Sequence, residues 1–118
     1  MASHRVDGRK LRRKMGPRLA LYKNLTVSVL RYERIRTTEA KAKEVQGRIE
    51  RAITLAKRGD LSARRAVVSQ FPNEPLVVTK LFDEIAPKYA DRTSGYTRIV
   101  KIGPRAGDNA EIVQLELV

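Results

Sequence analysis

TEAKAKEVQGRIERAITLAKRG, residues 38–59, has the clearest helical pattern in the chain. Its apolar residues recur at steps of three and four, which places them on one face of a helix. Thr38 can cap the N-terminus, and Glu39 suits the positive end of the helix dipole. Gly59 follows Lys57 and Arg58, a typical ending for a helix. The stripe expected to face the core consists of Ala42, Val45, Ile49, Ala52, Ile53 and Ala56.

A helix is also expected on the N-terminal side, over residues 17–31. Its expected apolar stripe again recurs at helical steps and consists of Leu19, Tyr22, Leu25 or Thr26, Val29 and Leu30. Pro17 suits the first helical position, because the N–H that proline lacks would be unpaired there in any residue. Arg18, Lys23 and Arg31 fall off the apolar stripe. The N-terminal end of this helix is joined directly to the basic residues that precede it.

Two shorter helices are expected on the C-terminal side of residues 38–59. Asp60 or Ser62 can cap the first of them. Asn73 can cap the second, with Pro75 in its first turn. Pro87 would stop or kink the end of this last helix, because proline removes a helical hydrogen bond.

Three segments read as short strands: residues 34–38, 96–102 and 110–118. Turn-forming residues fill positions 103–109, so the simplest assembly is an antiparallel hairpin joined by the first strand. The four helices would pack on one face of this small sheet. The expected fold is therefore α+β, with two layers and the order helix, strand, three helices, two strands.

Positive charge is concentrated near the N-terminus. The chain has a net charge of +12, and residues 1–36 hold eleven Lys and Arg against two acidic residues. Residues 37–118 are closer to balance, with fourteen Lys and Arg against eleven acids. The first residues are too charged and too poor in apolar side chains to offset their ordering entropy by burial. We therefore expect one domain, residues 1–118, made of an extended basic arm (1–15) and a globular body (16–118).

The composition argues against several functional classes. There is no cysteine and only one histidine, which excludes disulfides, cysteine nucleophiles and zinc sites built from Cys or several His. No apolar run approaches the roughly 20 residues of a membrane span, and no secretory signal is visible. The glycines of residues 103–107 lead into a strand, unlike a phosphate-cradling loop. We expect no enzyme activity, no cofactor, no small-molecule substrate and no membrane partner.

The excess charge predicts a polyanionic partner. Lys and Arg neutralise phosphates and release counterions, which is the main source of affinity for nucleic acids. Side chains that read base edges are sparse on the predicted helices, and aromatic residues are only 5% of the chain. These features favour folded RNA, bound through its shape and backbone. A DNA-binding architectural protein is the alternative, with a membrane-surface protein or a solubilising basic tail less favoured.

Outside the arm, the basic residues allow more than one interpretation. Arg36, Lys41 and Lys43 cluster where a strand meets the helix of residues 38–59. Arg64 and Arg65 are either a binding surface or a face of surface salt bridges. The loop of residues 105–110 has small residues around one arginine, which suits close approach to a sugar-phosphate chain but equally a plain hairpin turn.

Six motifs, in this order and spacing, resemble the family of the bacterial-type large-subunit ribosomal protein seventeen, over nearly the whole chain. They are HRxxGRKLxR at residues 4–13, TTxxKAKE at 37–44, ITLAK at 53–57, LF and AP at 81–82 and 86–87, GYTRI at 95–99 and RAGDNA at 105–110.

The resemblance implies a non-catalytic protein of the cytoplasmic ribosome. It implies binding to large-subunit ribosomal RNA near the exit of the nascent-peptide tunnel, beside neighbouring large-subunit proteins, with a role in subunit assembly and stability. The family's RNA contacts are carried over to the residues that match its motifs. The other basic residues of the arm and the body are added because of their charge. The resulting candidate RNA-binding residues are His4, Arg5, Gly8, Arg9, Lys10, Arg12, Arg13, Lys14, Arg18, Lys23, Arg36, Lys41, Arg98 and Arg105.

Overall fold

The computed structural model describes residues 15–118, so the predictions made for residues 1–14 lie outside the described part. Nine elements follow one another in this part. They are α1 (Met15–Tyr32), β1 (Arg34–Thr38), α2 (Glu39–Arg58), α3 (Leu61–Gln70), α4 (Pro75–Lys80), the π-helical turn η2 (Leu81–Ile85), α5 (Ala86–Lys88), β2 (Thr97–Pro104) and β3 (Glu111–Leu117).

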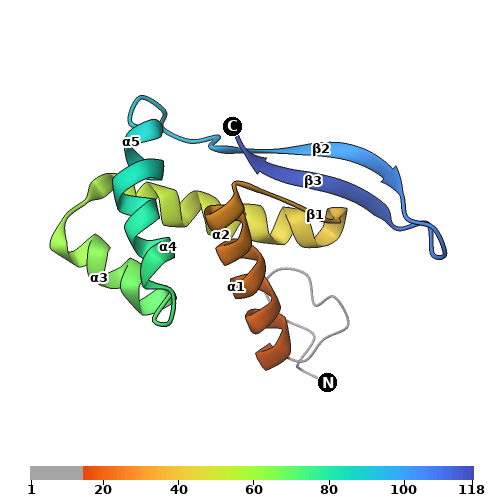
Figure 1. The fold of residues 1–118 in the computed structure, drawn as a ribbon, viewed down its shortest axis with the longest axis horizontal. Coiled ribbons are helices and arrows are strands. Elements are labelled where there is room, and N and C mark those ends of the chain that lie inside the picture. Colours follow the sequence, from red (N-terminus) through yellow and green to blue (C-terminus); the bar gives the residue numbers. More distant parts are fainter. Residues whose placement is uncertain (1–14) are drawn as a thin grey trace, which may run out of the picture.

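Helix α2 lies at the centre of the molecule, beneath the sheet (Figure 1). It contacts α1, α3, η2, α5 and all three strands. All six residues of its predicted apolar stripe are buried. The helix ends as predicted, because Gly59 adopts a left-handed conformation and its N–H donates to the carbonyl of Leu55 at 3.4 Å. Thr38 occupies the predicted N-cap position, but its side chain makes no capping hydrogen bond.

The sheet is antiparallel with the strand order β1-β3-β2, so the C-terminal hairpin is joined by the first strand as predicted. Leu115 of β3 pairs with Ile35 on one side and Ile99 on the other. The helices lie on one side of this sheet (Figure 1), which confirms the two-layer α+β fold. Alternate residues of β3 are buried against them: Val113, Leu115 and Leu117.

The predicted phase of α1 is wrong at its N-terminal end. The helix begins at Met15, and Arg18 is only 4% exposed. Leu19, expected on the apolar stripe, is 42% exposed. The buried stripe runs through Arg18, Tyr22 and Thr26 at steps of four. Arginine can occupy such a position because its long aliphatic stem packs like an apolar side chain.

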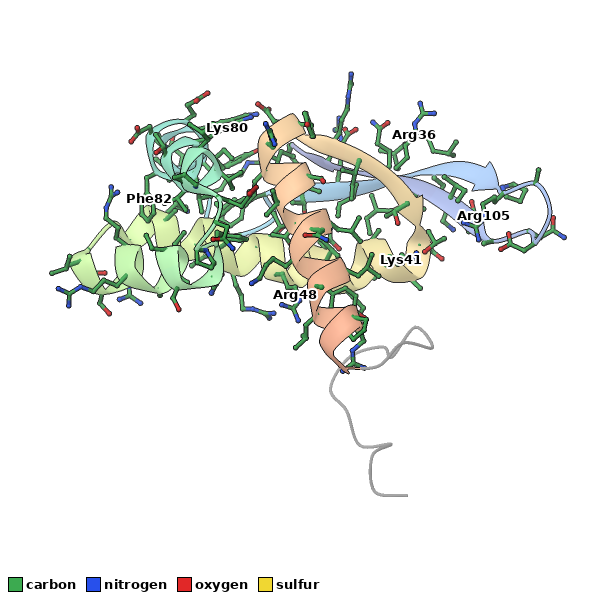
Figure 2. The ribbon with its side chains drawn as sticks, turned by 60° about the horizontal axis from the view of Figure 1, so that its bottom comes forward. Arg36, Lys41, Arg48, Lys80, Phe82 and Arg105 are labelled. Atoms are coloured by element: carbon green, nitrogen blue, oxygen red, sulfur yellow. The ribbon has the colours of Figure 1, made fainter. Side chains whose placement is uncertain are left out.

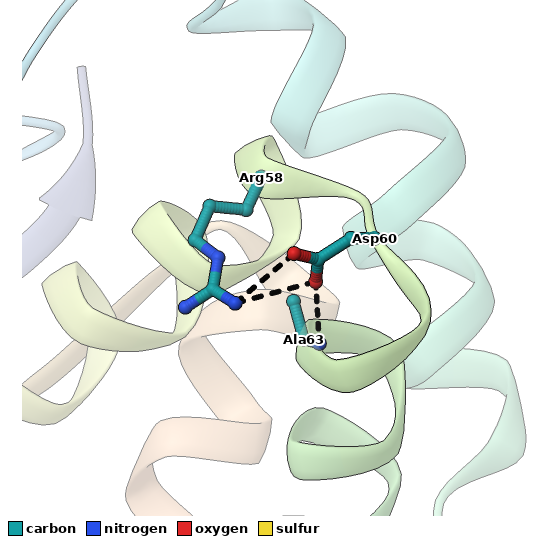
Figure 3. Close-up of polar contacts among 3 residues, drawn as sticks. All are labelled: Arg58, Asp60 and Ala63. Atoms are coloured by element: carbon teal, nitrogen blue, oxygen red, sulfur yellow. Dashed lines mark hydrogen bonds and ion pairs between the residues drawn. The ribbon is translucent and has the colours of Figure 1, made fainter.

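The caps of the two shorter helices were predicted with mixed success. Asp60 caps α3, accepting a 2.7 Å hydrogen bond from the N–H of Ala63 and lying 3.1 Å from the Arg58 guanidinium (Figure 3). The Ala63 hydrogen bond, followed by the one from Arg58, lowers the pKa of Asp60. Asn73 was predicted to cap the next helix, but Glu74 holds the N-cap position of α4, with Pro75 following as expected.

The last predicted helix runs through α4, η2 and α5, and it ends next to Pro87, which was predicted to stop or kink that end. Pro87 lies within α5, and the chain leaves the helix after Lys88. Just before it, the N–H of Ala86 bonds to the carbonyl of Leu81, five residues earlier. Proline cannot donate to the carbonyl four residues before it, and its ring crowds that carbonyl. A widened π turn accommodates both restrictions without ending the helix.

Glu50 fastens the C-terminal strands to α2. One of its oxygens accepts from the N–H groups of Gly95 and Tyr96, at 3.2 and 3.3 Å. The other accepts from the N–H and hydroxyl of Thr97, at 3.0 and 2.7 Å. The carboxylate thereby satisfies the backbone at the start of β2, and this contact fixes where the hairpin leaves the helical layer.

Replacement by alanine should have opposite effects on stability at Gly47, within α2, and at Gly59, just after its end. A Cβ at Gly47 would meet only Arg51 Nη1, at 3.8 Å, so Gly47→Ala should raise the free energy of unfolding by about 0.5–1 kcal/mol through helix propensity. Gly59 has φ +68°, so Gly59→Ala should lower it by about 1 kcal/mol. Urea unfolding of both variants tests this, and equal signs for the two would contradict it.

Removing the Glu50 carboxylate should weaken the attachment of β2. Glu50→Ala leaves several partly buried donors without their acceptor, and we expect a loss of about 1–3 kcal/mol in the free energy of unfolding. Glu84→Ala, which removes an exposed carboxylate, is the matched control and should change it by less than about 0.5 kcal/mol. Thermal and urea unfolding measure both, and a Glu50→Ala protein as stable as the control would refute this role.

Candidate nucleic-acid interface

The candidate residues of the body occupy several elements. Lys23 is exposed on α1, Arg36 is exposed on β1, and Lys41 is half-buried near the start of α2. Arg36, Lys41 and Arg105 lie at the end of the molecule where the β2–β3 hairpin projects (Figure 2). Arg18 lies in the buried stripe of α1 and offers little surface to a partner. The arm candidates, residues 4–14, lie outside the described residues.

Two of the predicted arginines are paired with acids. Arg98 of β2 lies 2.5 Å from a carboxylate oxygen of Glu116, its neighbour across the strand pair. Hydrogen bonds from Gln114 and then Arg98 lower the pKa of Glu116. Arg105 forms an ion pair with Asp108 in the hairpin turn.

The Arg105 loop is a closed hairpin turn. The N–H of Arg105 donates to the carbonyl of Ala110 at 2.7 Å, and the N–H of Asn109 donates to the carbonyl of Arg105 at 3.0 Å. The hydrogen bond from Arg105, then that from the N–H of Ala110, lowers the pKa of Asp108 to about 2. The same pair raises the pKa of Arg105. Arg105 is therefore presented on a fixed turn with its charge partly satisfied.

The other basic residues of the body differ in whether they pair with an acid. Lys43 lies 4.0 Å from Glu39, a weak surface pair. Arg64 makes no salt bridge with any described residue, and its guanidinium lies over the Phe82 ring at 4.3 Å. Arg65 is exposed beside it. The salt-bridge face considered for Arg64 and Arg65 is therefore wrong within the described chain.

A cationic groove that the sequence reasoning missed lies between α1, α2 and the end of α3. Its volume is about 670 Å³, and Lys23, Arg48 and Arg51 contribute its cations. The Arg48 guanidinium lies 5.1 Å from the centre of the Tyr22 ring, which ties it to α1. Arg48 and Arg51 are three residues apart, so they share a flank of α2. That spacing was the available signal, but nothing in the sequence showed that Lys23 would face the same flank.

The described residues present charged groups that can bind a partner. Among residues 15–118, no three potential metal-ligating side chains gather in one place. Within the same span, no helix has the length and apolar character to cross a bilayer. What the surface presents is cations distributed over α1, α2 and the sheet, an arrangement that suits an extended polyanion.

Comparison with known proteins points in the same direction. The ribosomal protein L17 family matches residues 21–118. Over 110 residues, the chain is 58% identical to the large ribosomal subunit protein bL17 of Desulfitobacterium hafniense, covering 93% of this chain and 97% of the relative. The bL17 protein of Clostridium botulinum is also 58% identical over 110 residues, covering 93% and 96%. Because these matches span most of both sequences, the chain belongs to the ribosomal protein L17 family.

Proposed function

We propose that this chain is a non-catalytic, structural constituent of the large ribosomal subunit that binds ribosomal RNA. The basic arm, residues 1–15, and cationic surfaces of the body, residues 16–118, would make the contacts. Through them the protein would support subunit assembly and stability on the solvent side, near the exit of the peptide tunnel. Neighbouring large-subunit proteins would complete its surroundings. Membership of the ribosomal protein L17 family supports this proposal.

One observation carries the proposal: the excess positive charge is available to a partner. Residues 1–36 hold eleven Lys and Arg against two acids. In the described body, carboxylates such as Glu33 and Glu39 each lie beside two cations. Several cations nevertheless have no acidic partner among residues 15–118: Lys23, Arg36, Lys41, Arg51 and Arg65. Such cations give up no internal ion pair when they meet phosphate.

The body can orient the arm because α1 is firmly packed. Its last turns bury Val29 and Leu30 completely, and its first turns bury Arg18 and Tyr22. The arm continues directly into this helix at Met15. An RNA strand that follows the arm would therefore meet a rigid helix whose direction the core has set.

Affinity for a large-subunit RNA fragment should fall steeply with salt, and the arm should supply much of that slope. Replacing Arg9, Lys10, Arg12, Arg13 and Lys14 by glutamine should flatten the plot of log K against log salt by about 0.7–0.9 unit for each phosphate-binding cation replaced. Fluorescence anisotropy across salt concentrations measures this. Arg58→Gln, which removes a cation already paired with Asp60, is the control and should leave the slope nearly unchanged.

An unchanged slope in the arm variant would refute the arm's role. Competition with duplex DNA separates the alternative function, since an architectural DNA-binding protein would bind both nucleic acids comparably.

Arg105 can contact phosphate fully only by leaving Asp108. Asp108→Asn removes this competition and should tighten RNA binding by up to about fivefold, the scale of one exposed ion pair. Arg105→Ala should weaken it. Glu111→Gln is the matched control, because it removes a nearby negative charge that forms no salt bridge within residues 15–118. Equal tightening by Asp108→Asn and Glu111→Gln, measured by anisotropy, would show a general charge effect and no specific contact of Arg105.

A further inference from the structure

The groove between α1, α2 and α3 combines an apolar floor with a cationic rim. Leu55 and Phe71 line its interior, and Phe71 is only 4% exposed. Lys23 reaches it from α1, and Arg48 and Arg51 reach it from α2. Figure 2 shows Arg48 beside α1, the helix that continues from the arm. Its volume of about 670 Å³ falls among pockets of about 300–1,000 Å³ that enclose small organic ligands.

The side chains that line the groove carry a net positive charge. Its one carboxylate belongs to Glu50, and both oxygens of that group accept hydrogen bonds from residues 95–97. The acid is therefore committed to holding β2 in place. Three cations remain around the opening, which makes an anionic occupant electrostatically complementary.

The other polar groups of the groove differ in their availability. The hydroxyl of Thr26 already donates to the carbonyl of Tyr22 at 2.7 Å, and the hydroxyl of Thr54 lies 3.4 Å from that of Tyr96. Gln70 and Ser94 have exposed side chains at the edge of the groove. An amide and a hydroxyl can each donate and accept, so they can meet the edge of a nucleobase.

We propose that this groove receives a single unpaired nucleotide of the RNA partner. The base would lie on the half-buried Leu55, with the buried Phe71 beneath it closing the floor of the groove, and its phosphates would contact Lys23, Arg48 and Arg51. Proteins commonly recognise RNA by capturing unstacked bases on aromatic or arginine surfaces, because bases inside an A-form helix are hard to reach. This inference rests on the proposed RNA-binding function and adds the structural class of RNA: a bulge, loop or strand end.

A neighbouring hollow supports an extended strand path. Its volume is about 380 Å³, and it shares Lys23 and Phe71 with the groove. It continues along α1 toward the turn before α4, with polar groups from Asn24 and Ser28 on α1 and from Asn73 in the turn, and with the carboxylate of Glu74 at its far end. A nucleotide seated in the groove could thus have its neighbour along the same helix.

The test uses the full chain and two RNA duplexes of about 20 base pairs, one fully paired and one with a single bulged 2-aminopurine. We expect the protein to prefer the bulged RNA by at least about fivefold and to change the fluorescence of the bulged base. Arg48→Gln/Arg51→Gln should remove both the preference and the fluorescence change. Arg58→Gln/Lys88→Gln removes the same charge from two exposed cations outside the groove that are already paired with Asp60 and Glu33, and should keep both.

Further measurements separate the possible failures. Thermal unfolding checks that each double variant is folded, and Lys23→Gln, a change at an exposed site, should reduce the preference by itself. Binding of both RNAs without preference overturns the groove and leaves the proposed function standing. An equal loss in the two double variants also overturns the groove. No binding to either RNA overturns both. A preference that persists when the arm cations are neutralised supports the groove as the source of the preference.

Discussion

The structure depends on burial of the apolar stripe of α2. Six small or aliphatic side chains along this helix are almost completely removed from water. Every other layer of the molecule packs against it, with α1 and α3 at its sides and the sheet above. The core contains no tryptophan, and its stabilisation comes from many aliphatic contacts of modest size together with the buried rings of Tyr22, Phe71, Tyr89 and Tyr96. Residues on the flanks of α2, such as Arg48 and Glu50, are consequently held in fixed positions at the boundaries between layers.

Most of the fold follows from residue patterns within single helices and strands, and the rest depends on packing between them. The stripe of α2 and its end at Gly59 were predictable because both follow from spacing and backbone chemistry within one helix. The phase of α1 was missed at Arg18, since a charged residue was assigned to the surface by its charge and not by its position. The π turn before Pro87 was also missed. It reflects a helix that continues past a proline because Leu81 and Ile85 before the proline and Tyr89 after it are buried.

The charge distribution of the candidate site was predictable, and its detailed pairing was not. A count of residues along the chain is enough to show that the N-terminal third is basic. The partner of Arg98 depends on strand register, which sets Glu116 opposite it. The groove depends on α1, α2 and the end of α3 meeting with particular flanks facing one another. Arg48 and Arg51 therefore gain significance only in three dimensions.

The irregular outer strand of the hairpin has a consequence for how copies of the protein meet one another. Strand β2 pairs with β3 on one side, leaving its other edge without a strand partner among the described residues. A bulge lies between Lys101 and Gly103, and Pro104 has no N–H to offer. A bent, charged edge of this kind is a poor template for another chain. The β2 edge therefore disfavours edge-to-edge pairing of two copies, although exposed Val100 and Ile102 lie on that same strand.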